Sequence, residues 1–146
     1  MTLYLDTSSL VKLYVAEAGS EDVRSHVDRA AIVATSMIAY PEARAALARR
    51  RREGALRPAA FVDAARRFES DWPKYVAVQV SEGLCREAGN LAERYALRGC
   101  DSVHLASFLE IAREVGVDDT EFSSFDDRLN RAARLATRGR RRSART

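Results

Sequence analysis

The sequence predicts an α/β protein, a three-layer α/β/α sandwich with a central, mainly parallel sheet of four to five strands. Two observations support this prediction. Short segments with the composition of strands alternate with longer segments of helical periodicity, and this alternation is typical of parallel strands joined by helical crossovers. The chain has 146 residues, which is long enough for one domain with a substantial hydrophobic core.

The first half of the chain contains two predicted strands, residues 2–6 and 32–36, which are rich in Leu, Tyr, Ile and Val. Segments of helical character follow each of them. These are predicted at residues 8–16, at residues 20–30, over a long stretch that stops at Gly54, and from Pro58 to about Trp72. Glycine commonly follows the last helical residue and proline fits the first turn, so Gly54 and Pro58 separate two helices.

The second half contains two further predicted strands, residues 76–80 and the more polar residues 120–124. Three helices are predicted here, from Ser81 to about Arg98 with Gly99 as its stop, from Asp101 to Gly116, and from Asp126 to about Thr137. From Arg138 onward the chain has five arginines and no acidic residue. We therefore expect one folded domain over residues 1–137 and a basic, disordered tail over residues 138–146.

The composition limits the class of protein. Hydrophobic residues make up 47% of the chain and charged residues 31%, which indicates a globular rather than a disordered protein. No apolar run approaches the roughly 20 residues that cross a bilayer, and no signal-peptide pattern precedes the first strand. We expect a cytoplasmic protein without membrane contact. Cys85 and Cys100 form no metal or redox motif, and we expect both to be reduced and mostly buried.

Four acidic residues lie where a predicted strand or loop turns into a helix: Asp6, Glu42, Asp101 and Asp126. Ligands of open α/β sheets bind beyond the carboxyl ends of the strands, so we expect these side chains to converge there. Converging carboxylates repel one another unless a cation lies between them. Oxygen ligands suit Mg²⁺ or Mn²⁺, and no His/Cys cluster indicates zinc. Such an ion can activate water and neutralise charge on a phosphate.

Helix capping is the alternative explanation for these acids. Asp6, Asp101 and Asp126 all stand where aspartate is a favoured N-cap, and Glu42 suits an exposed position on a helix. Capping accounts for any one of them better than for the set, because the helices predicted elsewhere begin at Ser20, Pro58 or Ser81.

Several polar residues near these acids are secondary candidates. Ser8 and Ser124 each lie two residues from an acid and could support a metal site, although such hydroxyls more often serve turns and caps. His104 follows Asp101 by one turn and could line the cleft, but we expect it to be a packed helical histidine. The run from Arg49 to Arg52 is either a solvated helix end or a contact for a phosphate backbone. The candidate contacts to a phosphate backbone are Arg49, Arg140, Arg141 and Arg142.

Four short motifs, in order and at suitable spacing, resemble the PIN domain of the VapC toxin type. They are YLDTSSLVKLY at 4–14, PEARAAL at 41–47, LRGCDSVHLA at 97–106 and SSFDDRL at 123–129. Each motif carries one of the four acids, and the resemblance spans about residues 2–136. The polar segment 117–124 departs from the pattern, because the family usually has an apolar strand there.

The resemblance implies a metal-dependent endoribonuclease toxin of a VapBC-type toxin–antitoxin system, which hydrolyses RNA with a carboxylate-bound Mg²⁺ or Mn²⁺ ion that activates water. Asp6 and Asp101 match the principal metal ligands of the family, and Glu42 and Asp126 match the residues that complete its acidic quartet. Ser8 and Ser124 occupy its small-hydroxyl positions. The resemblance also implies a homodimer and a cognate VapB-type antitoxin.

Two other functions are compatible with parts of the pattern. A non-catalytic RNA-binding PIN-like module would have the same fold but would need no working acids. A phosphatase with an aspartate nucleophile also begins with a strand and an aspartate, but it requires a second aspartate where this chain has Ser8.

Overall fold

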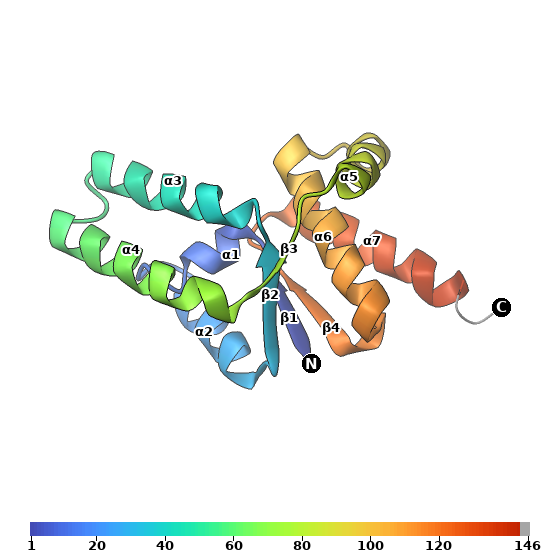
Figure 1. The fold of residues 1–146 in the computed structure, drawn as a ribbon, viewed down its shortest axis with the longest axis horizontal. Coiled ribbons are helices and arrows are strands. Elements are labelled where there is room, and N and C mark those ends of the chain that lie inside the picture. Colours follow the sequence, from blue (N-terminus) through green and yellow to red (C-terminus); the bar gives the residue numbers. More distant parts are fainter. Residues whose placement is uncertain (144–146) are drawn as a thin grey trace.

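The computed structural model describes residues 1–143, which form a four-stranded parallel sheet with helices on both faces (Figure 1). The strands are β1 (Thr2–Leu5), β2 (Ile32–Ser36), β3 (Val76–Val78) and β4 (Thr120–Ser123). Their order in the sheet is β3-β2-β1-β4. The predicted α/β class, the layered arrangement and the parallel sheet are confirmed.

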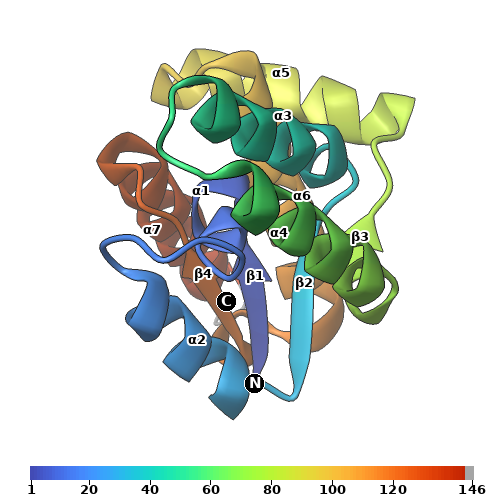
Figure 2. The ribbon, with the colours of Figure 1, turned by 90° about the vertical axis from the view of Figure 1, so that its left-hand side faces the viewer.

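Within residues 1–143, seven α-helices cover the sheet. They are α1 (Thr7–Val11), α2 (Ser20–Arg29), α3 (Ala39–Arg52), α4 (Pro58–Asp71), α5 (Glu82–Tyr95), α6 (Gly99–Val115) and α7 (Asp127–Ser143), with two 3₁₀ turns at Trp72–Lys74 and Val117–Asp119. Helices α1–α4 lie on one face of the sheet and α5–α7 on the other (Figures 1 and 2). Among the described residues, no helix is both long and apolar enough to span a membrane.

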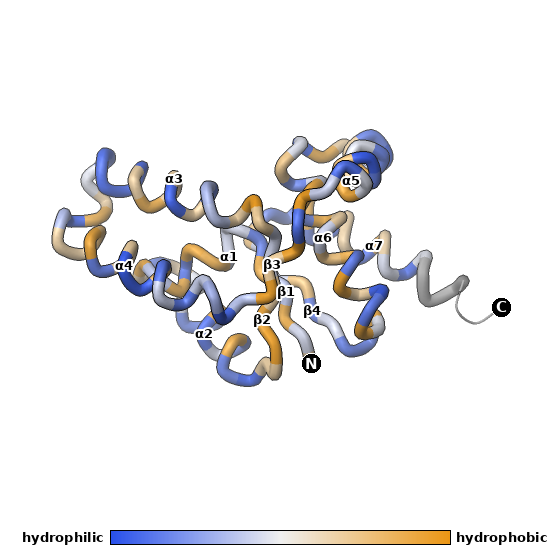
Figure 3. Tube along the Cα trace, viewed as in Figure 1, coloured by the Kyte–Doolittle hydropathy of each residue, from blue (hydrophilic) through white to orange (hydrophobic). Residues whose placement is uncertain are grey.

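The side chains of β1 alternate between two hydrophobic cores. Leu3 and Leu5 pack under α1–α4, whereas Tyr4 packs with residues of α5–α7, and all three are fully buried. A parallel sheet covered on both faces requires apolar residues on each side, and this explains the uninterrupted run at the start of the chain. In Figure 3, β2 at the centre is hydrophobic, whereas α3 and α4 contain hydrophilic stretches.

The strand order reverses at β1, between β2 on one side and β4 on the other. The chain passes from β1 to β2 and β3, and then returns to the other side of β1, where Leu5 pairs with Ser123. In open parallel sheets, such a reversal of strand order opens a ligand crevice at the carboxyl ends of the strands. A ligand site is therefore expected at the residues that follow β1 and β4.

Several predicted boundaries are wrong. Helix α5 ends at Tyr95, because Ala96 adopts a left-handed conformation (φ 52°) and the amides of Ala96 and Leu97 both bond to the carbonyl of Ala92. Gly99 is consequently the first residue of α6, not the stop of the preceding helix. Helix α1 and strand β3 are also shorter than predicted.

The last helix is longer than predicted. Helix α7 continues past Thr137 to Ser143, because its Ala, Leu and Arg residues favour a helix and no proline interrupts them. Residues 144–146 lie outside the described residues. The expected burial of the cysteines is also wrong, since Cys85 and Cys100 are both exposed free thiols.

The burial of Leu105 on α6 gives a first prediction. Leu105 is fully buried, so Leu105→Ala should lower the free energy of unfolding by about 2–5 kcal/mol because it leaves a cavity. Leu135 on α7 is 45% exposed, and Leu135→Ala should cost about 0.5 kcal/mol or less. Urea unfolding followed by circular dichroism measures both. Equal losses would contradict the assignment of the core.

Candidate active site

The candidate site lies at the carboxyl ends of β1 and β4. Asp6 directly follows β1, and its backbone amide donates to the carbonyl of Ser123 at the end of β4 at 3.1 Å. Asp126 immediately precedes α7, whereas Glu42 and Asp101 lie in the first turns of α3 and α6. All four predicted acids therefore lie where the parallel sheet places the starts of its helices.

The carboxylate of Asp6 is buried and accepts three hydrogen bonds. Its Oδ1 accepts from the hydroxyl of Ser8 at 2.7 Å and from the amide of Ser9 at 3.0 Å, and its Oδ2 accepts from the hydroxyl of Ser124 at 2.6 Å. Burial raises the pKa of Asp6 above its ordinary value, and these hydrogen bonds, with the charge of His104, offset only part of that rise.

Ser8 and Ser124 connect the two loops that bear the acids. The hydroxyl of Ser8 accepts from the amide of Phe125 at 2.9 Å, and the hydroxyl of Ser124 accepts from the amide of Asp126 at 3.0 Å. Each serine thus donates to Asp6 and accepts from the backbone before α7. The two predicted supporting residues hold Asp6 in place and fix the start of α7.

Glu42 is held by a separate set of donors. Its Oε1 accepts from Thr7 Oγ1 at 2.7 Å and from His104 Nε2 at 2.8 Å. Burial by itself raises the pKa of the Glu42 carboxyl, but the hydrogen bonds from His104 and Thr7 and the charge of His104 outweigh it, so the pKa lies below the ordinary value. Glu42 therefore stays ionised at neutral pH.

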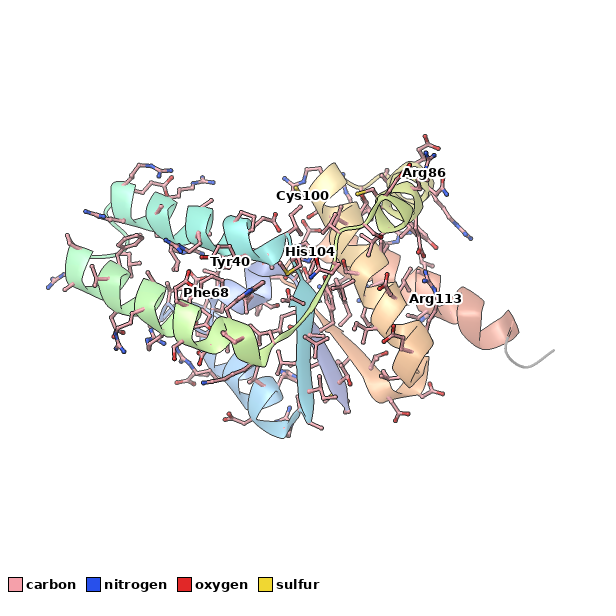
Figure 4. All side chains as sticks on the ribbon, viewed as in Figure 1. Tyr40, Phe68, Arg86, Cys100, His104 and Arg113 are labelled. Atoms are coloured by element: carbon pink, nitrogen blue, oxygen red, sulfur yellow. The ribbon has the colours of Figure 1, made fainter. Side chains whose placement is uncertain are left out.

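His104 contributes more than the helix packing expected from the sequence. It lies on α6 facing the start of α3 (Figure 4), and it is buried. Because a carboxylate only accepts hydrogen bonds, Nε2 of His104 donates to Glu42, while Nδ1 bonds to the hydroxyl of Tyr4 at 2.9 Å. Burial raises the pKa of the Tyr4 phenol, and the charges of Asp6 and Glu42 raise it further, so Tyr4 remains neutral.

Asp101 and Asp126 share one basic partner. Arg98 Nε donates to Asp101 Oδ2 at 3.1 Å, and Arg98 Nη2 lies 3.7 Å from Asp126 Oδ2. These three residues line a cavity of about 470 Å³ together with Asp127 and Arg128. Asp126 also caps α7, because its Oδ1 accepts from the amide of Leu129 at 2.8 Å. Asp101, in contrast, is not a cap.

The donor types at this site fit a hard divalent cation, since they are carboxylate oxygens. Their present arrangement is one of separate groups: Asp6 with two serines, Glu42 with His104, and Asp101 with Asp126 through Arg98. Within the part of the chain whose side chains are described, no three His, Cys, Asp or Glu residues are placed to hold one ion. The metal site remains a prediction.

The predicted RNA contacts lie beside this site or beyond the described side chains. Arg49 lies on α3 in a groove of about 750 Å³ that begins at Thr7 and Glu42, and its Nε donates to Glu53 at 2.9 Å. Arg52 lines the same groove. Arg140, Arg141 and Arg142 belong to α7, but their side chains lie outside the described residues.

Comparison with known proteins gives consistent results. The family model of the PIN domain matches residues 3–135. Ribonuclease VapC45 of Mycobacterium tuberculosis (strain CDC 1551 / Oshkosh) and ribonuclease VapC49 of Mycobacterium tuberculosis (strain ATCC 25618 / H37Rv) are each 37% identical to this chain over 134 residues, which cover 92% of this chain and 90% of each relative.

The fold is similar to the crystal structure of Mycobacterium tuberculosis VapC20, which is described as a toxin that cleaves the sarcin–ricin loop. The TM-score is 0.64, and the match covers 89% of this chain and 94% of that chain at 22% sequence identity. At this level of identity the likeness supports the fold alone.

The raised pKa of Asp6 predicts how stability depends on pH. Its ordinary value is 3.8, and below that pH both the folded and unfolded states bind the proton, so the buried charge costs nothing. The cost grows as the pH rises from the unfolded-state value to the folded-state pKa, and it is complete above that pKa. In EDTA at pH 7, Asp6→Asn should therefore melt above wild type, and the difference should shrink as the pH falls below the folded-state pKa of Asp6.

Asp126→Asn is the matched control, because Asp126 is more exposed and asparagine is an equally good helix cap. Its melting temperature should stay near that of wild type across the same pH range, as measured by circular dichroism. An Asp6→Asn protein less stable than wild type at pH 7 would show that the hydrogen bonds to Asp6 outweigh the cost of its burial.

Proposed function

The chain belongs to the PIN domain family, and from this membership we propose that it is a VapC-type toxin, a metal-dependent endoribonuclease of a VapBC-type toxin–antitoxin system. The observation that carries the proposal is the placement of Asp6, Glu42, Asp101 and Asp126 at the carboxyl edge of the sheet, where α/β proteins bind their ligands. The names of the two relatives, both ribonucleases, support the same activity.

The four carboxylates are the proposed ligands of Mg²⁺ or Mn²⁺, with Asp6 and Asp101 as the principal ones. When bound, such an ion lowers the pKa of a water molecule and neutralises charge on the phosphate, so that hydrolysis leaves 5′-phosphate and 3′-hydroxyl ends. The chain itself contributes carboxylates whose positions are fixed before a ligand binds. Ser8 and Ser124 hold the carboxylate of Asp6 from both sides.

The position of the Glu42 carboxylate is fixed by a different set of donors. His104 and Thr7 both donate to one of its oxygens and keep it ionised, which leaves the other oxygen for a ligand or a water molecule. We assign His104 as a positioning residue for Glu42, a role that a packed histidine without this contact would lack.

The proposed partners are an RNA substrate, a cognate VapB-type antitoxin and a second copy of the chain in a homodimer, all in the cytoplasm. The nuclease domain comprises residues 1–137 in this proposal. Arg49, in the groove that begins at Glu42, is proposed to contact the RNA backbone. Arg140, Arg141 and Arg142 are proposed to add further phosphate contacts.

A non-catalytic RNA-binding module is the second candidate. The observation in its favour is that no three of the described His, Cys, Asp and Glu residues are arranged to hold an ion. The retention of all four acids favours the nuclease instead, since RNA binding alone does not need a row of carboxylates facing a polyanion.

Asp101 provides the test of the proposed activity. Wild type, freed of any antitoxin, should cut defined tRNA and rRNA fragments with Mn²⁺ or Mg²⁺ and not with EDTA. Asp101→Asn should reduce the cleavage rate by about 100-fold or more while the circular dichroism spectrum is unchanged. If both proteins bind RNA equally in EDTA and neither cuts it, the binding-module function replaces the nuclease.

A further inference from the structure

Arg98 occupies an unusual place among the basic residues near the candidate site. It immediately precedes α6 in an extended conformation (φ −67°, ψ 157°), and its guanidinium lies between Asp101 and Asp126. The side chain of Arg98 is nevertheless 80% exposed, whereas those of Asp101 and Asp126 are 22% and 35% exposed. The guanidinium of Arg98 is therefore accessible to a ligand and lies beside two of the four acids.

The protein does not need this contact to hold either acid in place. Asp126 is fixed by its cap on α7, through the oxygen that Arg98 does not approach. The backbone of Asp101 is fixed within the first turn of α6, a long helix with many buried residues. Exposed ion pairs contribute little to folding stability. The position of Arg98 thus calls for a reason other than stability.

The chemistry of the guanidinium suggests that reason. Its planar fork of N–H donors binds carboxylates and phosphates with equal ease. Asp6 and Glu42 receive their hydrogen bonds from neutral hydroxyls of serine and threonine and from the buried His104. Asp101 and Asp126 instead share Arg98, whose side chain is long and exposed. Another cation can replace a partner of this type.

We propose that Arg98 has two alternative partners. In the ion-free protein it bridges Asp101 and Asp126 and competes with a divalent cation for them. When those carboxylates hold the ion and RNA is bound, Arg98 donates to an oxygen of the RNA phosphate at the site. This inference rests on the proposed nuclease function, and it assigns Arg98 as a phosphate-binding residue that also weakens metal binding by the free protein.

The two roles predict effects of opposite sign for one substitution. Arg98→Gln removes the competing cation, so the RNA-free protein should bind Mn²⁺ roughly two- to fivefold more tightly than wild type. The same substitution removes a phosphate donor, so single-turnover RNA cleavage at saturating Mn²⁺ should fall roughly 100-fold. A purely structural arginine would change neither quantity in this way.

Arg86→Gln is the matched control. Arg86 on α5 is 78% exposed and pairs with Glu82 at 2.8 Å, so it resembles Arg98 in exposure and in having a carboxylate partner, but it lies away from the site (Figure 4). It should leave both the Mn²⁺ affinity and the cleavage rate unchanged. Circular dichroism of all three proteins checks the fold, and titration of Mn²⁺ followed by electron paramagnetic resonance measures binding without RNA.

The outcomes separate the inference from the function on which it rests. An active wild type with an Arg98→Gln variant that binds Mn²⁺ no more tightly, or that cuts RNA at the wild-type rate, overturns the proposal for Arg98 and leaves the nuclease intact. A wild type that binds Mn²⁺ but cuts no RNA overturns the proposed function and with it the phosphate role. A tighter Mn²⁺ site in Arg98→Gln then still supports the competition.

Discussion

The buried carboxylate of Asp6 is the interaction on which the rest of the site depends. It accepts hydrogen bonds from the first turn of α1, which follows β1, and from the loop after β4, and so joins the two strands at the point where the strand order reverses. Because Ser8 and Ser124 also accept from the amides of Phe125 and Asp126, the same carboxylate fixes the start of α7. Buried polar groups must be hydrogen-bonded, and here that requirement is met by one closed network.

The four acids avoid mutual repulsion by having different partners. Hydroxyls and an amide stabilise Asp6, His104 and Thr7 stabilise Glu42, and a guanidinium stabilises Asp101 and Asp126. Asp6 and Glu42 thus have short-range partners from neighbouring elements, whereas Asp101 and Asp126 share one exposed arginine. The repulsion argument that predicts a cation from the sequence applies with most force to Asp101 and Asp126, where the shared partner is itself a cation.

The sequence predicts the strands, the class of fold and the position of each acid, because these depend on local composition and on the rule that parallel strands end at one edge. It does not predict the contact between Glu42 and His104, since those residues are 62 positions apart and no local pattern joins them. It also misplaces the end of α5, because alanine rarely adopts the left-handed conformation that Ala96 has. For Arg98, three residues before Asp101, the sequence predicts only that it ends a helix.

Helix capping and site chemistry are not competing explanations for these aspartates. A parallel sheet brings the starts of its helices to the same edge as its ligands, so a cap residue there is already at the site. Asp126 shows how one carboxylate serves both purposes, since Oδ1 accepts from the amide of Leu129 while Oδ2 faces Arg98 across the cavity. The cap fixes the orientation of the carboxylate and thereby aims its second oxygen. Asp6 is both the N-cap of α1 and the centre of the network between the loops, so a residue that stabilises its helix is also suited to hold a ligand with little loss of side-chain entropy.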